Sequence, residues 1–301
     1  MNIHIIIVTY NGAEWIRKCI DSLLNSTIAV KIKVIDNLST DDTVAILERE
    51  YPSVDLIRSE INLGFGKANN LLMRNAMADG ADYVFLLNQD AWVNEDTIAG
   101  LIDIQVKNPE YGIISPMHLN GKGDSLDYNF ARYCNEDDCP GILADIFLDR
   151  KKDVYPIDTV NAALWLMSRD CLTKVGLFDP VFPHYGEDTD YLRRVKKFNV
   201  KVGLSPKFCG YHDRDYRPSS VKRDRVIRHL SLLCELKDVN RSFMSAILFT
   251  IILSMKFTAE DLFKGKYEMA WTNITGLFTL LFKIPEVKRL RKICSMPGAY
   301  L

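Results

Sequence analysis

The chain has 301 residues, of which 48% are hydrophobic and 26% are charged, enough for one large α/β domain with an appendage or for two domains. A formal net charge of −1 excludes the strongly basic character of nucleic-acid-binding proteins, so we predict no nucleic-acid partner. The seven cysteines include no C-x-x-C pair, which favours a reducing cytoplasm over a disulfide framework. The start, "MNIHIIIVTYNG", lacks a basic region and a cleavage site and predicts no signal peptide.

The first hundred residues alternate β-branched runs with amphipathic stretches. The runs predict strands over Ile3–Val8, Lys31–Asp36, 54–59 and 82–88, and the stretches between them predict helices over 13–25, 39–50 and 66–80. This alternation is typical of a doubly wound, mainly parallel, Rossmann-like sheet. Ligands bind outside the carboxyl ends of such strands, where Asp36 and Asp90 lie. We therefore expect both carboxylates to share one crevice.

The second half of this region is less regular. Tyr111–Met117 predicts another strand, and it is followed by a long polar segment, Leu119–Asp158. A connection of this length is usually functional, so we expect it to line the acceptor side of a site. Order returns with an apolar run over 159–170, a helix entered through three acids over 186–198, and a strand over 200–205.

From Val221 onward the chain is predicted to be all-helical. It contains two apolar stretches of 14 residues, Ser242–Met255 and Met269–Phe282, and the part from Arg241 to the end has 9 basic and 4 acidic residues, net +5. Neither stretch reaches the ~18–20 residues needed to span a bilayer. Two interpretations stay open: helices that lie in the membrane interface, or helices that pack on the main domain or on another copy.

The acidic residues point to cation and proton chemistry. Hard divalent cations take oxygen ligands, often one or two carboxylates together with substrate phosphates. Asp90 could supply such a ligand and leave positions open for a diphosphate, and His212 could add a nitrogen ligand. The pair Glu187–Asp188 would titrate: neighbouring acids raise its pKa values and the helix N-terminus lowers them. A dehydrogenase is disfavoured, because the first turn, "TYNGAEW", has one glycine and a bulky Tyr10.

Five segments in chain order resemble the motifs of family 2 glycosyltransferases, in their rhamnosyltransferase-like bacterial branch with the GT-A fold: "IIIVTYNGAEWIRKCIDSL", "VIDNLSTDDT", "NLGFGKANN", "LLNQDAWV" and "LFDPVFPHYGEDTDYLRR". The resemblance covers roughly residues 3–220 and is specific because all five occur in order. It implies inverting transfer from a nucleotide-diphosphate sugar, with Mg²⁺ or Mn²⁺, to a hydroxyl of a glycan or lipid-linked acceptor in polysaccharide and cell-envelope synthesis.

The resemblance also implies roles for individual residues. Asp188 would be the general base with Glu187 beside it, and Asp90 and His212 would hold the metal. The donor-binding residues would be Thr9, Tyr10, Asn11, Asp36, Asn37, Ser39, Gly66, Asn70, Asn88 and Gln89. The acceptor would contact Asn161, Trp165, Tyr185 and Asp190. Two departures stand out: Gln89 replaces a frequent proline, which would loosen the turn, and Gly186 replaces a bulky residue, which would widen the acceptor pocket.

We therefore predict a GT-A domain over residues 1–228, with a nucleotide-sugar half (1–100) and an acceptor half (101–228). A C-terminal helical extension would cover residues 229–301 and would hold a cytoplasmic protein on the inner face of the cytoplasmic membrane, or mediate oligomer formation. An alternative is a non-catalytic nucleotide-sugar-binding or scaffolding protein of the same fold. The sugar, the acceptor and the linkage do not follow from the sequence.

Overall fold

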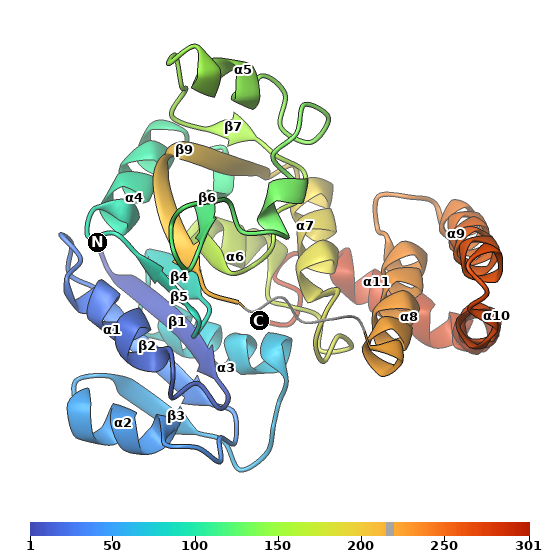
Figure 1. Ribbon diagram of the computed structural model, residues 1–301, viewed down its shortest axis with the longest axis horizontal. Coiled ribbons are helices and arrows are strands. Elements are labelled where there is room, and N and C mark those ends of the chain that lie inside the picture. Colours follow the sequence, from blue (N-terminus) through green and yellow to red (C-terminus); the bar gives the residue numbers. More distant parts are fainter. Residues whose placement is uncertain (215–219) are drawn as a thin grey trace.

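A nine-stranded sheet lies at the centre of the computed structural model, which describes residues 1–214 and 220–301 (Figure 1). The strands follow the order β3-β2-β1-β4-β8-β6-β9-β5, and β7 pairs with β9. Their bounds are β1 Ile3–Thr9, β2 Lys31–Asp36, β3 Asp55–Arg58, β4 Tyr83–Leu87, β5 Ala91–Val93, β6 Tyr111–Asn120, β7 Tyr155–Pro156, β8 Leu164–Ser168 and β9 Lys201–His212. The strands predicted in the first hundred residues are all present.

The pairing of the strands confirms the doubly wound α/β prediction and adds a mixed half. The strands β3, β2, β1 and β4 pair in parallel, as strands joined by crossover helices must. The strand β8 lies antiparallel between β4 and β6, while β6 and β9 are parallel. The short strands β5 and β7 both run antiparallel to β9.

Helices cover both faces of the sheet. The buried side chains of α1, α2 and α4 join one core cluster, and those of α3, α6 and α7 join the other. The strand β1 shows why: Ile5 and Ile7 point into the first cluster and Ile6 into the second, since successive strand residues face opposite sides. The helix bounds are α1 Ile16–Leu24, α2 Thr43–Glu50, α3 Phe65–Ala78, α4 Thr97–Lys107, α6 Arg169–Val175 and α7 Glu187–Lys197.

The long polar segment after β6 is folded over the body rather than left as a bare loop. It contains a short 3₁₀ helix, Phe130–Arg132, the helix α5, Ile142–Phe147, and the strand β7. Phe130 is fully buried and stacks on His118 of β6 with ring centroids 4.4 Å apart. This contact anchors the middle of the segment beside the sheet.

Four helices form the C-terminal part, as predicted, and stand beside the α/β body (Figure 1): α8 Val221–Lys237, α9 Phe243–Phe263, α10 Tyr267–Phe282 and α11 Ile284–Cys294. A third apolar cluster joins Phe182 of the body to leucines of α8 and α10. After α11 the chain returns to the body, where the Leu177 amide donates to the Ala299 carbonyl at 2.8 Å. The expected boundary between residues 228 and 229 falls inside α8.

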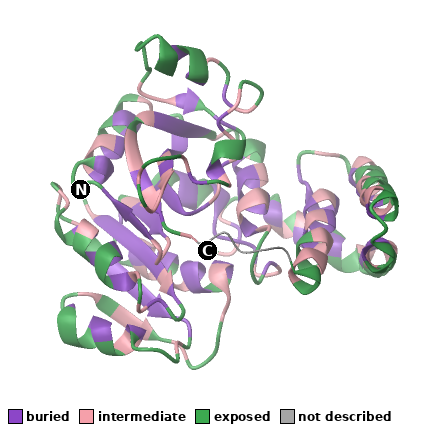
Figure 2. Cartoon of the chain, viewed as in Figure 1, coloured by how far each residue is buried: buried purple, intermediate pink, exposed green. Residues whose placement is uncertain are grey.

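The helix α9 is longer than its apolar stretch. It continues through Lys256 to Phe263 and has 21 residues. The prediction from its 14-residue apolar stretch, that this helix is too short to span a bilayer, is therefore wrong by length. Among residues 1–214 and 220–301, it is the one helix long and apolar enough to cross a membrane by length and composition, with 17% of its apolar window buried. Figure 2 shows that α9 and α10 are largely exposed, in contrast to the sheet.

Candidate active site at the carboxyl edge of the sheet

The carboxyl ends of β1 and β2 lie side by side at the edge of the sheet where ligands bind in α/β folds. Thr9 and Asp36 are register partners at the last residues of the two strands, and both are buried. The Asn37 amide donates to the Thr9 carbonyl at 2.7 Å, which continues the pairing one residue further. Three of the predicted donor-binding residues are thus brought together.

Asp36 has one oxygen engaged and one unpaired. The Ser39 amide donates to Asp36 Oδ2 at 3.0 Å, and the Asn11 amide donates to Ser39 Oγ at 2.8 Å. Asp36 Oδ1 is buried and has no hydrogen-bond partner within the described part of the chain. An unpaired buried acceptor is costly, so this oxygen is suited to receive a donor group of a bound ligand.

Gln89 fastens the first turn to the end of β4. Its Oε1 accepts from Thr9 Oγ1 at 2.6 Å and from the Tyr10 amide at 2.8 Å, and its Nε2 donates to the Tyr10 carbonyl at 3.1 Å. A Cβ at Gly12 would lie 2.3 Å from Gln89 Oε1, so the clamp requires glycine there. The expectation that Gln89 loosens this turn is wrong, because its amide cross-links the turn. The Tyr10 side chain is 47% exposed beside it.

Asp90 and His212 meet where β5 pairs with β9. His212 Nε2 lies 3.3 Å from Asp90 Oδ1 and 3.4 Å from Asn88 Nδ2. Its other ring nitrogen, Nδ1, lies 3.7 Å from Asp127 Oδ2. The His212 side chain is 2% exposed, whereas the Asp90 side chain is 21% exposed. A carboxylate and an imidazole therefore converge on a point that stays open on one side.

This corner fits a divalent cation. A carboxylate oxygen and a neutral imidazole nitrogen are both ligands for Mn²⁺, and Mg²⁺ binds by few protein ligands together with phosphate oxygens. Asp127 Oδ2 lies 3.7 Å behind His212 Nδ1, beyond hydrogen-bond distance, and Nδ1 has no hydrogen-bond partner among the described residues. Asp127 is itself held by Arg214, at 2.6 and 2.8 Å, and by the Phe130 amide at 2.8 Å. Burial alone would raise the pKa of Asp127, but these hydrogen bonds hold it below its usual range.

Glu187 and Asp188 open the helix α7. Burial, and then the neighbouring Asp188, raise the pKa of Glu187 to about 8, and its Oε2 has no hydrogen-bond partner among the described residues. Burial also raises the pKa of Asp188, but the Thr189 amide donates to it at 2.7 Å and Arg214 favours its charged form. Within the pair, the Thr189 amide and the charge of Arg214 thus act to favour the charged form of Asp188, whereas Glu187 Oε2 has no hydrogen-bond partner in the described part of the chain.

Asp127 and Arg214 were not predicted as site residues from the sequence, whereas Tyr133 belongs to the long polar segment that was expected to line the acceptor side. Burial and the charge of Asp188 raise the pKa of Tyr133, so this phenol of the long polar segment faces the acid pair. Arg214 pairs with Asp127 behind the Asp90–His212 corner, and its charge also favours the ionised form of Asp188. The available signals were the aromatic residues in the long segment and the charged run after His212, but neither gives a partner.

Three predicted site residues turn out to be structural. Trp165 is fully buried and packs against Phe178 and Tyr191, with ring centroids 6.3 and 6.0 Å away, so it belongs to the core rather than to an acceptor surface. Both ends of the Asn70 amide bond the Phe178 backbone, at 2.8 and 2.9 Å. Asp190 is 4% exposed and paired with buried cations, which removes it from the acceptor surface.

Of the remaining predicted residues, Gly66, Tyr185 and Gly186 lie beside the start of α7. A Cβ at Gly66 would lie 3.8 Å from Glu187 Cβ, so α3 begins against the acid pair. Tyr185 is 38% exposed on the turn before α7, and Asn161 Oδ1 is buried without a partner among the described residues. Gly186 has φ +90°, and a Cβ there would lie 3.0 Å from Phe182 and 3.1 Å from Cys234. Phe182 and Cys234 fill the space beside the Gly186 Cα, while the prediction of a roomier or more mobile acceptor pocket stays a prediction.

Comparison with known proteins identifies the family. The model of glycosyl transferase family 2 matches residues 4–169, which is more than half of the chain. A chondroitin synthase of Escherichia coli is 30% identical over 141 residues, 44% of this chain and 20% of that protein. An N-acetylglucosaminyl-diphospho-decaprenol L-rhamnosyltransferase of Mycobacterium tuberculosis is 26% identical over 216 residues, 64% of this chain and 70% of that protein.

Solved structures agree with this fold. The structure of S. aureus TarS 1-349 in complex with UDP-GlcNAc has a TM-score of 0.62 at 16% identity and covers 98% of this chain and 86% of that one. GalNAc-T7 with UDP, GalNAc and Mn²⁺ has a TM-score of 0.54 at 16% identity and covers 79% and 50%. With the family model matched over the half that carries β1 to β8, the chain belongs to glycosyl transferase family 2.

Proposed function

We propose that this glycosyltransferase moves a sugar, with inversion, from a nucleotide-diphosphate sugar to a hydroxyl of a glycan or lipid-linked acceptor in cell-envelope polysaccharide synthesis. The observation that carries the proposal is the acid pair at the start of α7, in which burial raises the pKa of both carboxyls while the Thr189 amide and Arg214 favour the charged form of Asp188. Such a pair near an Asp90–His212 corner suits proton removal close to a leaving diphosphate. The relatives' names, a rhamnosyltransferase for a diphospho-decaprenol and poly(ribitol-phosphate) transferases, support this acceptor class.

The donor would lie along the carboxyl edge of the sheet. The unpaired Asp36 Oδ1 would accept from the nucleotide base, with Thr9, Tyr10, Asn11, Asn37 and Ser39 around it. Asp90 and His212 would hold Mg²⁺ or Mn²⁺, with Asn88 beside them. The bound cation would neutralise the charge that grows on the departing diphosphate. Neighbouring folds bound to UDP-GlcNAc, or to UDP and Mn²⁺, support this reading.

Asp188 would act on the acceptor. It takes the proton of the acceptor hydroxyl while that oxygen attacks the anomeric carbon from the face opposite the diphosphate, so the new bond forms as the old one breaks and the configuration inverts. Glu187 keeps its proton and does not compete for this role. Tyr133 and Tyr185 would border the acceptor on either side of Asp188.

The test combines a donor panel with one substitution. Purified protein is incubated with UDP-, GDP- and dTDP-sugars and Mn²⁺, and release of the nucleotide diphosphate is measured. Asp188→Asn should lower turnover by ~10²–10⁴ while donor affinity stays close to that of the wild type. The matched control is Asp103→Asn, at an exposed position on α4. An Asp188→Asn protein that turns over at the wild-type rate, or a wild type inactive with every donor, contradicts the proposal.

We also propose that the α9–α10 hairpin lies in the interface of an anionic membrane. The exposed apolar residues of α9 repeat at helical spacing and form a stripe: Met244, Leu248, Ile252 and Met255. The stripe on α10 is Tyr267, Trp271, Phe278 and Phe282. Lysines lie within α9 and just beyond the ends of the two helices, so apolar contact and attraction to anionic lipid act together: Lys256, Lys264, Lys266 and Lys283.

Point variants test the membrane contact better than truncation, because the segment after α11 packs into the body. The double variant Trp271→Gln/Phe282→Gln should lose binding to vesicles of phosphatidylglycerol and phosphatidylcholine, and added salt should weaken binding of the wild type. The control is Phe147→Gln, an aromatic that is 87% exposed on α5. If the wild type ignores these vesicles at low salt, the hairpin is a packing or oligomer element.

A further inference from the structure

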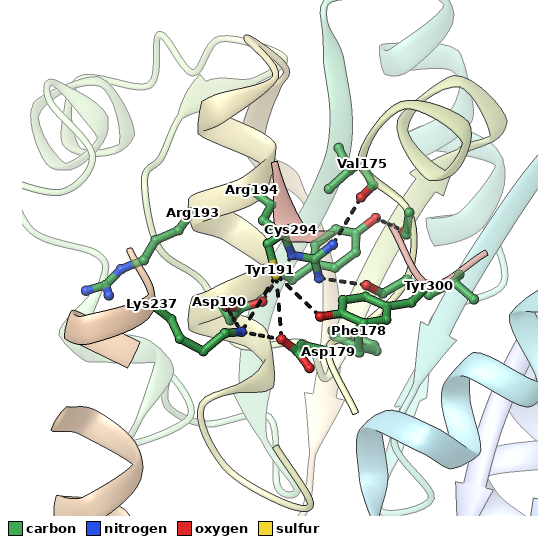
Figure 3. Close-up of polar contacts among 12 residues, drawn as sticks. Val175, Phe178, Asp179, Asp190, Tyr191, Arg193, Arg194, Lys237, Cys294 and Tyr300 are labelled. Carbon is green, nitrogen blue, oxygen red and sulfur yellow. Dashed lines mark hydrogen bonds and ion pairs between the residues drawn. The ribbon is translucent and has the colours of Figure 1, made fainter. Parts of the chain in front are cut away.

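A buried ionic cluster joins the C-terminal helices to the start of α7 (Figure 3). Lys237, the last residue of α8, has a fully buried side chain whose Nζ pairs with Asp179 Oδ2 and with Asp190 Oδ1, the latter at 2.8 Å. Arg194, also fully buried, pairs with Asp190 Oδ2 at 3.0 Å. Two cations thus face two carboxylates, and the cluster is neutral as a whole.

This cluster is not a metal site. Ligand atoms of Asp179, Asp190 and Cys294 lie within 4.8 Å of one another, as they would around a cation. Lys237 Nζ already lies among them, bonded to both carboxylates and 3.7 Å from Cys294 Sγ. The ammonium group supplies the positive charge that a metal ion would bring. Its role therefore lies in the two carboxylates that it holds together.

The two carboxylates bracket the segment that carries the acid pair. Asp179 precedes the turn 180–186, and Asp190 lies in the first turn of α7, two residues after Asp188. A single side chain from α8 therefore ties both ends of this segment. The segment has a second tie to the same helix, since Cys234 Sγ donates to the Gly186 carbonyl at 3.5 Å.

Further ties join this segment to the same helix. Arg193 of α7 pairs with the Cys234 carbonyl and with the Glu235 carboxylate, both on α8. The side-chain amide of Asn240, just after α8, donates from Nδ2 to the Arg193 carbonyl at 2.8 Å. On the body side, the Phe65 amide at the start of α3 donates to the Pro183 carbonyl in the turn, at 3.1 Å.

Building on the proposed function, we propose that Lys237 is a positioning residue for sugar transfer, through which the C-terminal helices set the place of Glu187 and Asp188. Removal of the ammonium group leaves two buried carboxylates with one arginine, an uncompensated charge beside the acid pair. The turn 180–186 can relieve that charge by moving Asp179 toward water, which displaces the base. The C-terminal extension is on this account part of the active site as well as a membrane contact.

The experiment compares Lys237→Met and Lys237→Arg with the wild type and with Lys222→Met, an exposed lysine on the same helix. Turnover, donor KM and amide hydrogen exchange of the peptide 180–189 are measured. Lys237→Met should lower kcat by ~10–100-fold with donor KM within about twofold, and should exchange faster over 180–189. Lys237→Arg should recover part of kcat because it restores the charge, and Lys222→Met should match the wild type.

Other outcomes distinguish a failure of the role proposed for Lys237 from a failure of the proposed glycosyltransferase function. A folded Lys237→Met protein with wild-type kcat and wild-type exchange overturns it, as does a loss of kcat without faster exchange. If Lys237→Met does not fold, the double variant Lys237→Met/Asp179→Asn takes its place. It leaves no uncompensated charge but still removes the tie from α8 to both ends of the segment, so a lower kcat and faster exchange over 180–189 than in the wild type are still expected. A wild type inactive with every donor overturns the proposed function instead, while the exchange rates still decide whether Lys237 holds the turn.

Discussion

Replacing Glu187 with glutamine should stabilise the fold, and the gain should grow with pH. The pKa of Glu187 is raised from its ordinary 4.5 to about 8 in the folded protein, first by burial and then by Asp188. Below pH 4.5 both the folded and unfolded states hold the proton, so the wild type and the variant should not differ through this group. Above 4.5 the unfolded wild type releases its proton while the folded state keeps it, so the stability contributed by the protonated group falls.

The size of the effect follows from the pKa difference. Stability changes by about 1.36 kcal/mol for each pH unit between the two pKa values. The Glu187→Gln variant should therefore gain about 3 kcal/mol over the wild type between pH 4.5 and pH 7, and at most about 5 kcal/mol above pH 8. Glutamine cannot ionise, so the variant does not lose this part of its folding stability as the pH rises.

Urea unfolding followed by circular dichroism at pH 5, 6, 7, 8 and 9 measures this difference. Glu95→Gln, at an exposed position, is the matched control and should follow the wild type at every pH. Parallel stability curves for Glu187→Gln and the wild type from pH 5 to pH 9 would refute the reasoning. Glu187 would then ionise freely in the folded protein, and the assignment of the base to Asp188 alone would lose its support.

Three further predictions follow from the same contacts. Asp90→Ala should weaken binding of a nucleotide sugar in the presence of Mn²⁺ but not in its absence, which calorimetry can measure; equal affinities for both proteins under both conditions would make Asp90 a turn residue. Gly186→Ala should destabilise the fold by about 1–3 kcal/mol, since φ is +90° and Phe182 and Cys234 fill the space, whereas Gly80→Ala, equally at positive φ but in open space, should cost less in the same urea assay. Gln89→Ala should cost about 1–3 kcal/mol because the Tyr10 amide loses its acceptor, and an unchanged unfolding midpoint would show that water replaces it.

The parallel half of the sheet could be predicted because local sequence determines it. Ile3–Val8 is apolar on both faces, and a strand that must be covered on both sides needs that pattern. The same reasoning placed Asp36 and Asp90 at carboxyl ends, and both ends lie at one edge in the structure. The mixed half could not be predicted in this way, because the antiparallel insertion of β8 between β4 and β6 depends on pairing across 80 residues.

The residues that failed as site predictions failed for a shared reason. Tryptophan is a residue type that often lines pockets. Trp165 is instead buried in the core because it lies on a central strand that is covered on both faces. Asp190 carries the charge of a site residue, but its partner Lys237 lies 47 positions away on a helix that the sequence does not orient. Sequence patterns predict the local helix or strand in which a polar residue lies. Whether its side chain binds a ligand or pairs within the core depends on the residues that long-range packing places next to it.

The two departures from the family pattern bear on whether this protein catalyses. A scaffold that had lost its chemistry would not need a rigid turn under Asp90, yet Gln89 fixes that turn with three hydrogen bonds where a proline would fix it by its ring. Gly186 likewise allows α8 to approach the turn before Asp188, and the same helix brings Lys237 to the carboxylates that bracket the acid pair. Both substitutions therefore come with contacts that hold the groups to which we assign metal binding and proton transfer. That pattern favours an enzyme whose active site is braced by its own C-terminal helices over a scaffold that retains the fold alone.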